Sequence, residues 1–159
     1  MNRWAKDGDY SWVPDGDLHA DPLADLMALN NSLSLWHIED DLSNMDDVIV
    51  ALAANMDIVQ SIDYLIFSSD AVAAADIGYR QTPGKTPFEP AQKWHYDLVN
   101  VSALRLVALA KAVFASSEAE RRPRHEILGL LADAVKSGRV DLESLKEKVR
   151  IDIAKAIRP

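Results

Sequence analysis

The sequence predicts an all-α fold, an antiparallel helical bundle of five to six helices, for three reasons. Apolar residues recur every three to four positions along most of the chain, which is the spacing of one helix face. Prolines, glycines and N-cap residues divide the chain into segments of helical length. No stretch of useful length alternates apolar and polar residues, as a half-buried strand does. With 48% hydrophobic and 26% charged residues, the 159-residue chain has the composition of a globular protein.

The first two helices are predicted from their capping residues. The first is expected over residues 21–42, because Asp21 is a good N-cap and the proline after it is favoured at the first helical position. The second follows a capping signal at Ser43 and is expected to reach residue 77, where Gly78 ends it. A helix of that length is long for a globular protein, so a kink near Ser68 is expected.

The second half of the chain is predicted to hold one loop and three more helices. Three prolines and two glycines between residues 78 and 90 argue against regular structure there. Gly138 is placed to end a helix, and the last segment carries an apolar stripe at helical spacing. The helices are expected over 90–116, 123–137 and 141–157.

The chain is predicted to form a polar N-terminal arm over residues 1–20 and a single helical domain over 21–159. The arm is rich in Asp and Gly and contains Trp4 and Trp12. A tryptophan in a polar arm carries a large apolar area that docks on the body of the protein or on a partner. Trp4 and Trp12 are therefore candidate partner-binding residues, and a terminus that is simply disordered or docked is the ordinary alternative.

Composition excludes several classes of site. The chain has no cysteine, so it forms no disulfide, zinc–thiolate site or iron–sulfur cluster, and it fits a reducing compartment. The first 20 residues lack the apolar core of a signal peptide, so we expect a soluble, cytoplasmic protein. The most apolar stretch, 98–115, is interrupted by Arg105 and Lys111 and is expected to be a core helix rather than a membrane span.

The formal net charge of −8 narrows the possible partners. Phosphate binding draws on basic patches, so nucleic acid is not expected as a partner. An acidic chain is compatible with a metal site, with a basic protein partner, or with solubility alone.

Acidic residues on the first two predicted helices form a candidate metal site. Residues three or four apart lie on one side of a helix, and residues seven apart share a face. If the two helices packed antiparallel, their polar strips would converge, and carboxylate oxygens are the ligands that Mg²⁺ or Mn²⁺ prefers. The ordinary alternative is that these side chains form the solvated edges of helices. The candidate ligands are His37, Glu39, Asp40, Asp63 and Asp70, with Asn30 and Asn55 as polar support.

Two resemblances bear on this hypothesis. Trp36–Asp40 resembles the Trp-His-x-Glu-Asp signature of an uncharacterised bacterial helical family, and Ile62–Leu65 is similar to its second-helix pattern. The order and spacing fit over residues 30–112, although the family's next polar run is replaced at 66–69 and only Asp70 matches it. This resemblance implies a helical fold and no particular activity.

The layout of acidic residues also resembles that of MazG-type all-α nucleotide pyrophosphohydrolases. Those enzymes bind Mg²⁺ with acidic pairs from successive helices, and Glu39, Asp40 and Asp63 occupy comparable places here. The Glu-x-x-Glu and Glu-x-x-Asp pairs of that family are incomplete in this chain. The resemblance implies metal-dependent hydrolysis of a nucleotide.

Two functions from different classes follow. The favoured hypothesis is a small acidic protein that acts through protein–protein interaction, as inhibitors and immunity proteins do. The alternative is a metal-dependent hydrolase of a nucleotide or another phosphate ester, using the carboxylates named above. A second copy of the chain is a further candidate partner, through a C-terminal stripe of Leu142, Leu145, Val149 and Ile153.

Overall fold

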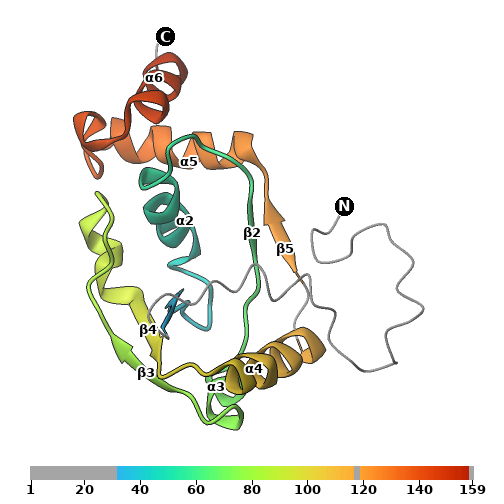
Figure 1. Cartoon of the computed structure of the whole chain (residues 1–159). Coiled ribbons are helices and arrows are strands. Elements are labelled where there is room, and N and C mark those ends of the chain that lie inside the picture. Colours follow the sequence, from blue (N-terminus) through green and yellow to red (C-terminus); the bar gives the residue numbers. More distant parts are fainter. Residues whose placement is uncertain (1–31, 117–118, 158–159) are drawn as a thin grey trace. The chain divides into compact units, whose positions relative to one another are not determined.

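A computed structural model describes residues 32–116 and 119–157, and it is a mixed α+β fold (Figure 1). The prediction of an all-α bundle is therefore wrong. The elements run in the order β1 (Leu33–Trp36), α2 (Met45–Ala54), β2 (Ile62–Tyr64), α3 (Ser69–Ala74), β3 (Gly78–Gln81), the 3-10 helix η1 (Glu89–Trp94), β4 (His95–Val99), α4 (Ala103–Ser116), β5 (Glu120–Arg122), α5 (Arg124–Lys136), the 3-10 helix η2 (Leu142–Ser144) and α6 (Glu147–Ala156).

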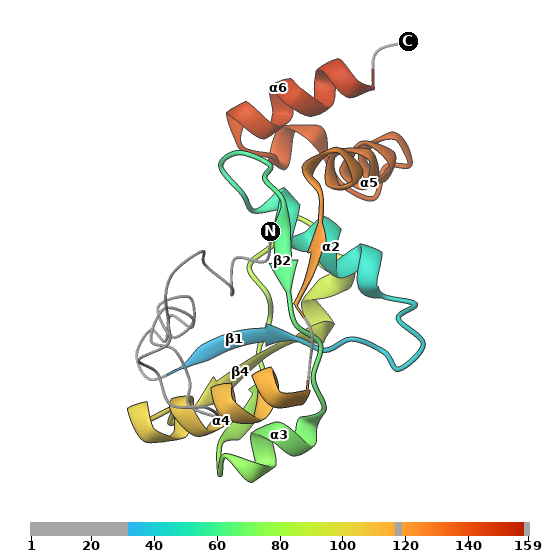
Figure 2. The same cartoon turned by 90° about the vertical axis from the view of Figure 1, so that its right-hand side faces the viewer.

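The strands form two antiparallel sheets. One sheet has three strands in the order β1-β4-β3, and the other pairs β2 with β5. Figure 2 shows β1 beside β4, and β2 beside β5. The pairings of β1 with β4 and of β2 with β5 join segments that are far apart in the sequence, whereas β3 and β4 follow one another.

The strands were not predicted from the sequence because each is only three to five residues long. In β1, Leu33 and Leu35 pack against a hydrophobic cluster while Ser34 between them is exposed, which is strand alternation over a single repeat. Such a short pattern also fits one helix face, and the helical spacing of the flanking leucines favoured that interpretation. The part of the first predicted helix that lies in the described chain is a strand followed by a loop.

The second predicted helix, over 44–77, is correct only over its first third. Helix α2 ends at Ala54 with Asn55 as its C-cap, and β2 and α3 occupy the rest. Ser68, where a kink was expected, is instead the N-cap of α3, and its hydroxyl accepts a hydrogen bond of 3.1 Å from the Asp70 backbone N–H. The expected loop over 78–90 begins with β3 instead.

The later helices were predicted better. The predicted helix over 90–116 is η1 and β4 in its first part and α4 in its second. Helix α5 confirms the prediction over 123–137, and Gly138 ends it with a φ of 73°. The Arg139 N–H donates to the Ala134 carbonyl over 2.9 Å, which is the bond expected after a left-handed C-terminal glycine. The segment 141–157 divides into η2 and α6.

The chain forms two compact units. Unit 1 takes in the described residues of Met1–Leu35, Asp63–Arg80 and Asp97–Glu120, and unit 2 takes in Trp36–Ile62, Gln81–Tyr96 and the described part of Arg121–Pro159. The chain passes from one unit to the other within each of its described strands. The predicted arm over 1–20 lies outside the described residues, and the prediction of one domain stays a prediction.

Each unit has its own hydrophobic core. In unit 1, α3 packs on α4, and the buried residues are Val72, Ala75, Ile77, Leu98, Val101, Leu109 and Val113. In unit 2, α5 packs on both α2 and α6, and η1 packs on α2. The largest fully buried side chains of unit 2 are Ile49, Val50, Val59, Phe88, Ile127, Leu131, Val140, Val149 and Ile153.

Within the described residues, none of the helices is long and apolar enough to cross a membrane. The apolar stretch that was expected to be a core helix divides between β4 and α4. Its most exposed large side chain is Leu104, at 85% exposure, while Leu98 is fully buried.

This contrast gives a stability test in unit 1. We expect Leu98→Ala to lower the free energy of unfolding by about 2–5 kcal/mol, because it removes buried methyl groups and leaves a cavity. Leu104→Ala is the matched control and is expected to change it by less than about 0.5 kcal/mol. Urea unfolding followed by circular dichroism measures both, and equal effects would contradict the core assignment.

Candidate functional site

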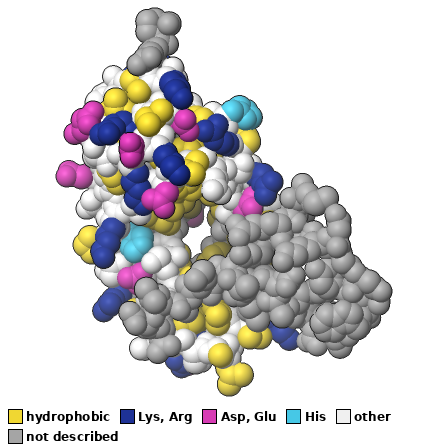
Figure 3. Space-filling model, turned by 45° about the horizontal axis from the view of Figure 1, so that its top comes forward, with side chains coloured by type: hydrophobic (Ala, Val, Ile, Leu, Met, Phe, Trp, Pro, Cys, Tyr) yellow, Lys and Arg dark blue, Asp and Glu magenta, His cyan; other side chains and the backbone are white. Residues whose placement is uncertain are grey.

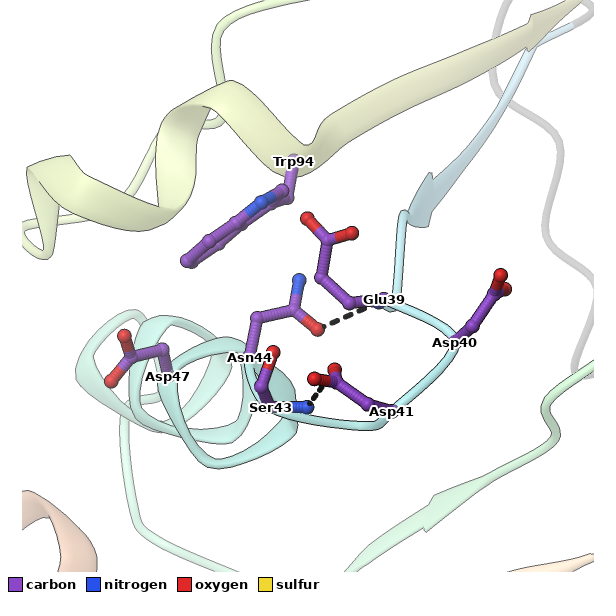
Figure 4. A pocket seen from close by; sticks show the side chains of 7 residues that line it. All are labelled: Glu39, Asp40, Asp41, Ser43, Asn44, Asp47 and Trp94. Carbon is purple, nitrogen blue, oxygen red and sulfur yellow. Dashed lines mark hydrogen bonds between the residues drawn. The ribbon is translucent and has the colours of Figure 1, made fainter.

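A shallow pocket lies in unit 2 beside the start of α2. Its volume is about 430 Å³, and it is lined by Glu39, Asp40, Asp41, Ser43, Asn44, Asp47 and Trp94 (Figure 4). Six of these residues come from the loop after β1 and the first turn of α2, and Trp94 ends η1. Four are carboxylates, and none of these lining residues is basic.

The loop that carries the carboxylates is shaped by the buried side chain of Asn44, which is 3% exposed. Its amide oxygen accepts a hydrogen bond of 2.9 Å from the Glu39 N–H, and its amide nitrogen donates to the His37 carbonyl over 3.0 Å. The His37 N–H in turn donates to the Trp94 carbonyl over 2.7 Å. One buried amide and one backbone bond thus connect the two walls of the pocket.

Leu42 lies in the same loop in an unusual conformation. Its φ is 60°, in the left-handed region that glycine adopts readily, and its side chain is 51% exposed. This backbone conformation costs a non-glycine residue about 1–2 kcal/mol. The loop supports it with hydrogen bonds from the Leu42 N–H to the Glu39 carbonyl and from the Met45 N–H to the Leu42 carbonyl.

Hydrogen bonds favour the ionised form of one carboxylate of the pocket. The Ser43 hydroxyl and backbone N–H both donate to the Asp41 carboxylate, which lowers the pKa of Asp41 below its ordinary value. Asp47 is 2.7 Å from the Arg139 guanidinium, while Glu39 faces only His37, at 3.6 Å.

The open part of the pocket is therefore anionic, and its roof is aromatic. Figure 4 shows the Glu39 and Asn44 side chains directed toward the Trp94 indole, and Asp40 directed away from it. The Lys93 ammonium lies 4.6 Å from the centroid of the Trp94 ring, so this indole already attracts a cation. An acidic pocket with an aromatic wall suits a cationic side chain.

The rest of the face around α5 and α6 differs in character. On the face shown in Figure 3, acidic and basic side chains are interspersed over the upper part, where these helices lie. Several of them form ion pairs, including Arg124 with Asp152 and Arg150 with Glu143 at 2.7 Å each. Such exposed pairs balance acids with bases, whereas no basic residue lines the pocket.

The residues predicted to bind a metal belong to both units. His37, Glu39 and Asp40 belong to unit 2, and none of them is on a helix. Asp63 lies in β2 and Asp70 in the first turn of α3, both in unit 1. Within residues 32–116 and 119–157, no three His, Asp or Glu side chains are grouped to hold a metal ion.

The other residues predicted to belong to a site are the two supporting asparagines and the two tryptophans of the arm. Asn55 is the C-cap of α2, while Asn30, Trp4 and Trp12 lie outside the described residues. The helical layout implied by both family resemblances is absent, because Glu39 and Asp40 are in a loop and Asp63 is in a strand. The metal-site assignment itself stays a prediction.

The sequence analysis did not identify several residues of the pocket. These are the hydrogen-bonded pair Asp41 and Ser43, the buried amide of Asn44 and the Trp94 wall. The Glu-Asp-Asp-Leu-Ser-Asn run carried a usable signal, because clusters of Asp, Ser and Asn are typical of loops. The partner of that loop, η1, is 50 residues away in the sequence, so no local pattern could reveal it.

Comparison with known proteins assigns no family. No protein-family model matches the chain, and no curated protein or solved structure matches it significantly. The function must therefore be argued from the site.

Asn44 allows a direct test of how the pocket is held together. We expect Asn44→Ala to destabilise the protein by about 1–3 kcal/mol, because it leaves the Glu39 N–H and the His37 carbonyl without their partner. Asn44→Asp keeps an acceptor but loses the donor, so the bond to His37 should still fail. Urea unfolding measures the loss, and amide hydrogen exchange at Glu39 locates it. Unchanged exchange at Glu39 would contradict this role.

Thermal unfolding with and without a divalent cation tests the prediction of a metal site. We expect the midpoint of thermal unfolding to be the same with and without Mg²⁺ or Mn²⁺, since a ligand raises the midpoint only when it binds the folded state. A rise that is lost in Asp63→Asn, and kept in Asp133→Asn as a charge-matched control, would restore the metal site.

Proposed function

We propose that this protein acts through protein–protein interaction, as an inhibitor or immunity-type protein that covers a basic surface of its partner. The observation that carries the proposal is the acidic pocket of unit 2, in which Glu39, Asp40 and Asp41 have no lysine or arginine among the pocket's lining residues. Exposed carboxylates are suited to meet cations from another molecule.

The electrostatics of the whole chain support the same proposal. A net charge of −8 attracts a basic partner over distances of about 10 Å at 0.1 M salt. Such steering raises association rates by about 10-fold to 1,000-fold, and it weakens as salt is added. An exposed carboxylate contributes little static affinity, so binding through this pocket should depend strongly on ionic strength.

The nature of the partner follows from the same charges. An acidic surface repels phosphates, so neither nucleic acid nor an anionic membrane is part of the proposal. A second copy would place like charges together if it used the pocket. The C-terminal stripe does not offer an alternative face for a dimer, because Leu145, Val149 and Ile153 are buried within unit 2. The cytoplasm remains the expected location of the partner.

Affinity capture from the cells that produce the protein tests the proposal. We expect a tagged full-length chain to retain a basic partner at low salt and to release it at high salt. Neutralising the pocket with Glu39→Gln, Asp40→Asn and Asp41→Asn together should reduce the recovery of that partner at least about 10-fold.

A matched control makes this result specific. Glu89→Gln, Asp133→Asn and Glu147→Gln remove the same three charges from exposed positions that do not line the pocket. We expect the control to capture the partner as the unmodified chain does. Equal losses of the partner in both triple variants would show that binding depends on net charge and not on the pocket. No loss in the pocket variant would overturn the proposal.

A further inference from the structure

Helix α4 is apolar on both of its sides. Apart from Arg105, Lys111 and Ser116, all of its residues are alanine, valine, leucine or phenylalanine. Its inner side supplies Leu109 and Val113 to the buried core of unit 1, where α4 packs on α3 (Figure 2). A helix that is apolar all round is typically covered on all sides, because exposed apolar surface is unfavourable in water. The outer side of α4 is therefore a candidate docking surface.

The outer side of α4 is exposed. Leu104, in the first turn, is 85% exposed, more than any other large apolar side chain of the described residues. Ala108 is also exposed, and Val107 is partly exposed. These two residues follow Leu104 by three and four positions, so the three side chains share one face of the helix. We call this surface, made of Leu104, Val107 and Ala108, the outer α4 face.

The segment that precedes the first described strand has an apolar side of its own. Residues 21–31 lie outside the described residues, so only their sequence is used. Leu26 and Met27 follow Leu23 by three and four positions, which is the spacing of one helix face. A segment with this pattern gains stability by packing its apolar side on another apolar surface.

The chain tethers this segment to the core beneath α4. Ser32 alone separates it from Leu33, and Leu33 and Leu35 pack against the same buried cluster as the inner side of α4. Extended, a segment of this length spans up to about 36 Å, and a helix with its side chains is about 10–12 Å wide. Residues 21–31 can therefore reach the outer α4 face. A short tether also gives them an effective concentration on the order of millimolar, which favours them over a molecule from solution.

We propose that residues 21–31 dock on the outer α4 face and cover Leu104. The charges of the two surfaces agree with this occupant. The segment carries Asp21 and Asp25 and no basic residue, whereas the charged residues of α4 are all basic. A second copy of the chain or another protein would lack the tether and would pay for its lost freedom of motion. The proposal concerns unit 1 and does not depend on the acidic pocket of unit 2.

Amide hydrogen exchange in the full-length chain tests the docking. We expect the amides of residues 21–31 to exchange at least about 10-fold more slowly than their intrinsic rates. Leu104→Glu places a charge in the apolar contact and should return them to those rates. Alanine would keep the face apolar, so Leu104→Ala is not the test. Ile151→Glu is the matched control, because Ile151 is 45% exposed on α6, and it should leave this exchange unchanged.

The outcomes of this experiment separate the possible occupants. Exchange of residues 21–31 at their intrinsic rates in the unmodified chain would overturn the proposal. So would protection that Leu104→Glu leaves unchanged. Protection that increases with protein concentration would assign the outer α4 face to a second copy and would also overturn it. Unchanged protection of the Leu98 amide in Leu104→Glu shows that the core of unit 1 remains folded.

Thiol labelling provides a second measurement from the other side of the contact. The chain has no cysteine, so Leu104→Cys introduces a single reactive thiol. Because thiol reactivity depends on access, adding Leu26→Asp should speed its reaction with a maleimide at least about five-fold. Ala28→Asp adds the same charge on the side of Asp25, three positions away, and should change the rate little. Equal rates in all three proteins would contradict the docking.

Discussion

The buried amide of Asn44 joins three parts of unit 2 that are otherwise separate. Its oxygen holds the Glu39 N–H, its nitrogen reaches the His37 carbonyl, and the His37 N–H binds the end of η1. A buried polar group is tolerated only when its hydrogen bonds are made, so the loop has little freedom to rearrange. This one side chain therefore fixes the loop at Glu39, at one edge of the pocket.

The buried hydroxyl of Thr86 holds the other wall of the pocket in place, the one that carries Trp94. The buried hydroxyl of Thr86 donates to the Ala51 carbonyl of α2 over 2.9 Å and accepts from the Phe88 N–H over 3.2 Å. It fixes the segment that leads into η1, where Phe88 and Ala91 are fully buried. Gly84 belongs to the same segment, and a Cβ there would lie 3.0 Å from the Trp36 ring and 3.2 Å from the His95 Cβ. Trp94 is thus presented from a rigid support, as a binding wall must be.

The chemistry of the site follows from where charge is balanced and where it is not. Around α5 and α6, several acids form ion pairs with bases. In the loop after β1, the carboxylate of Asp41 accepts its hydrogen bonds from Ser43 rather than from a cation. Hydrogen bonds keep a carboxylate ionised without neutralising it, which leaves the pocket free to meet a cation from another molecule.

The sequence by itself determined the elements whose signals are local. The course of α5 and its glycine end at Gly138 depend on residues within one or two turns. Helix α2 begins near the predicted position, although its N-cap is Asn44 and no side-chain hydrogen bond caps it. The excess of negative charge and the acidic character of residues 39–47 are also properties of the sequence alone. These features were predicted correctly, although the predicted fold class was wrong.

Tertiary structure decided the rest, because it depends on pairing between distant segments. Strands of three to five residues carry too little pattern to be told from helix faces, and they form only because β4 supplies hydrogen bonds to β1 and β3, and β5 to β2. Once residues 33–36 and 62–64 are extended, the helical spacing that linked His37 with Asp40, and Asp63 with Asp70, has no meaning. The same long-range packing brings Trp94 over the acidic loop, so the pocket exists only in the folded chain.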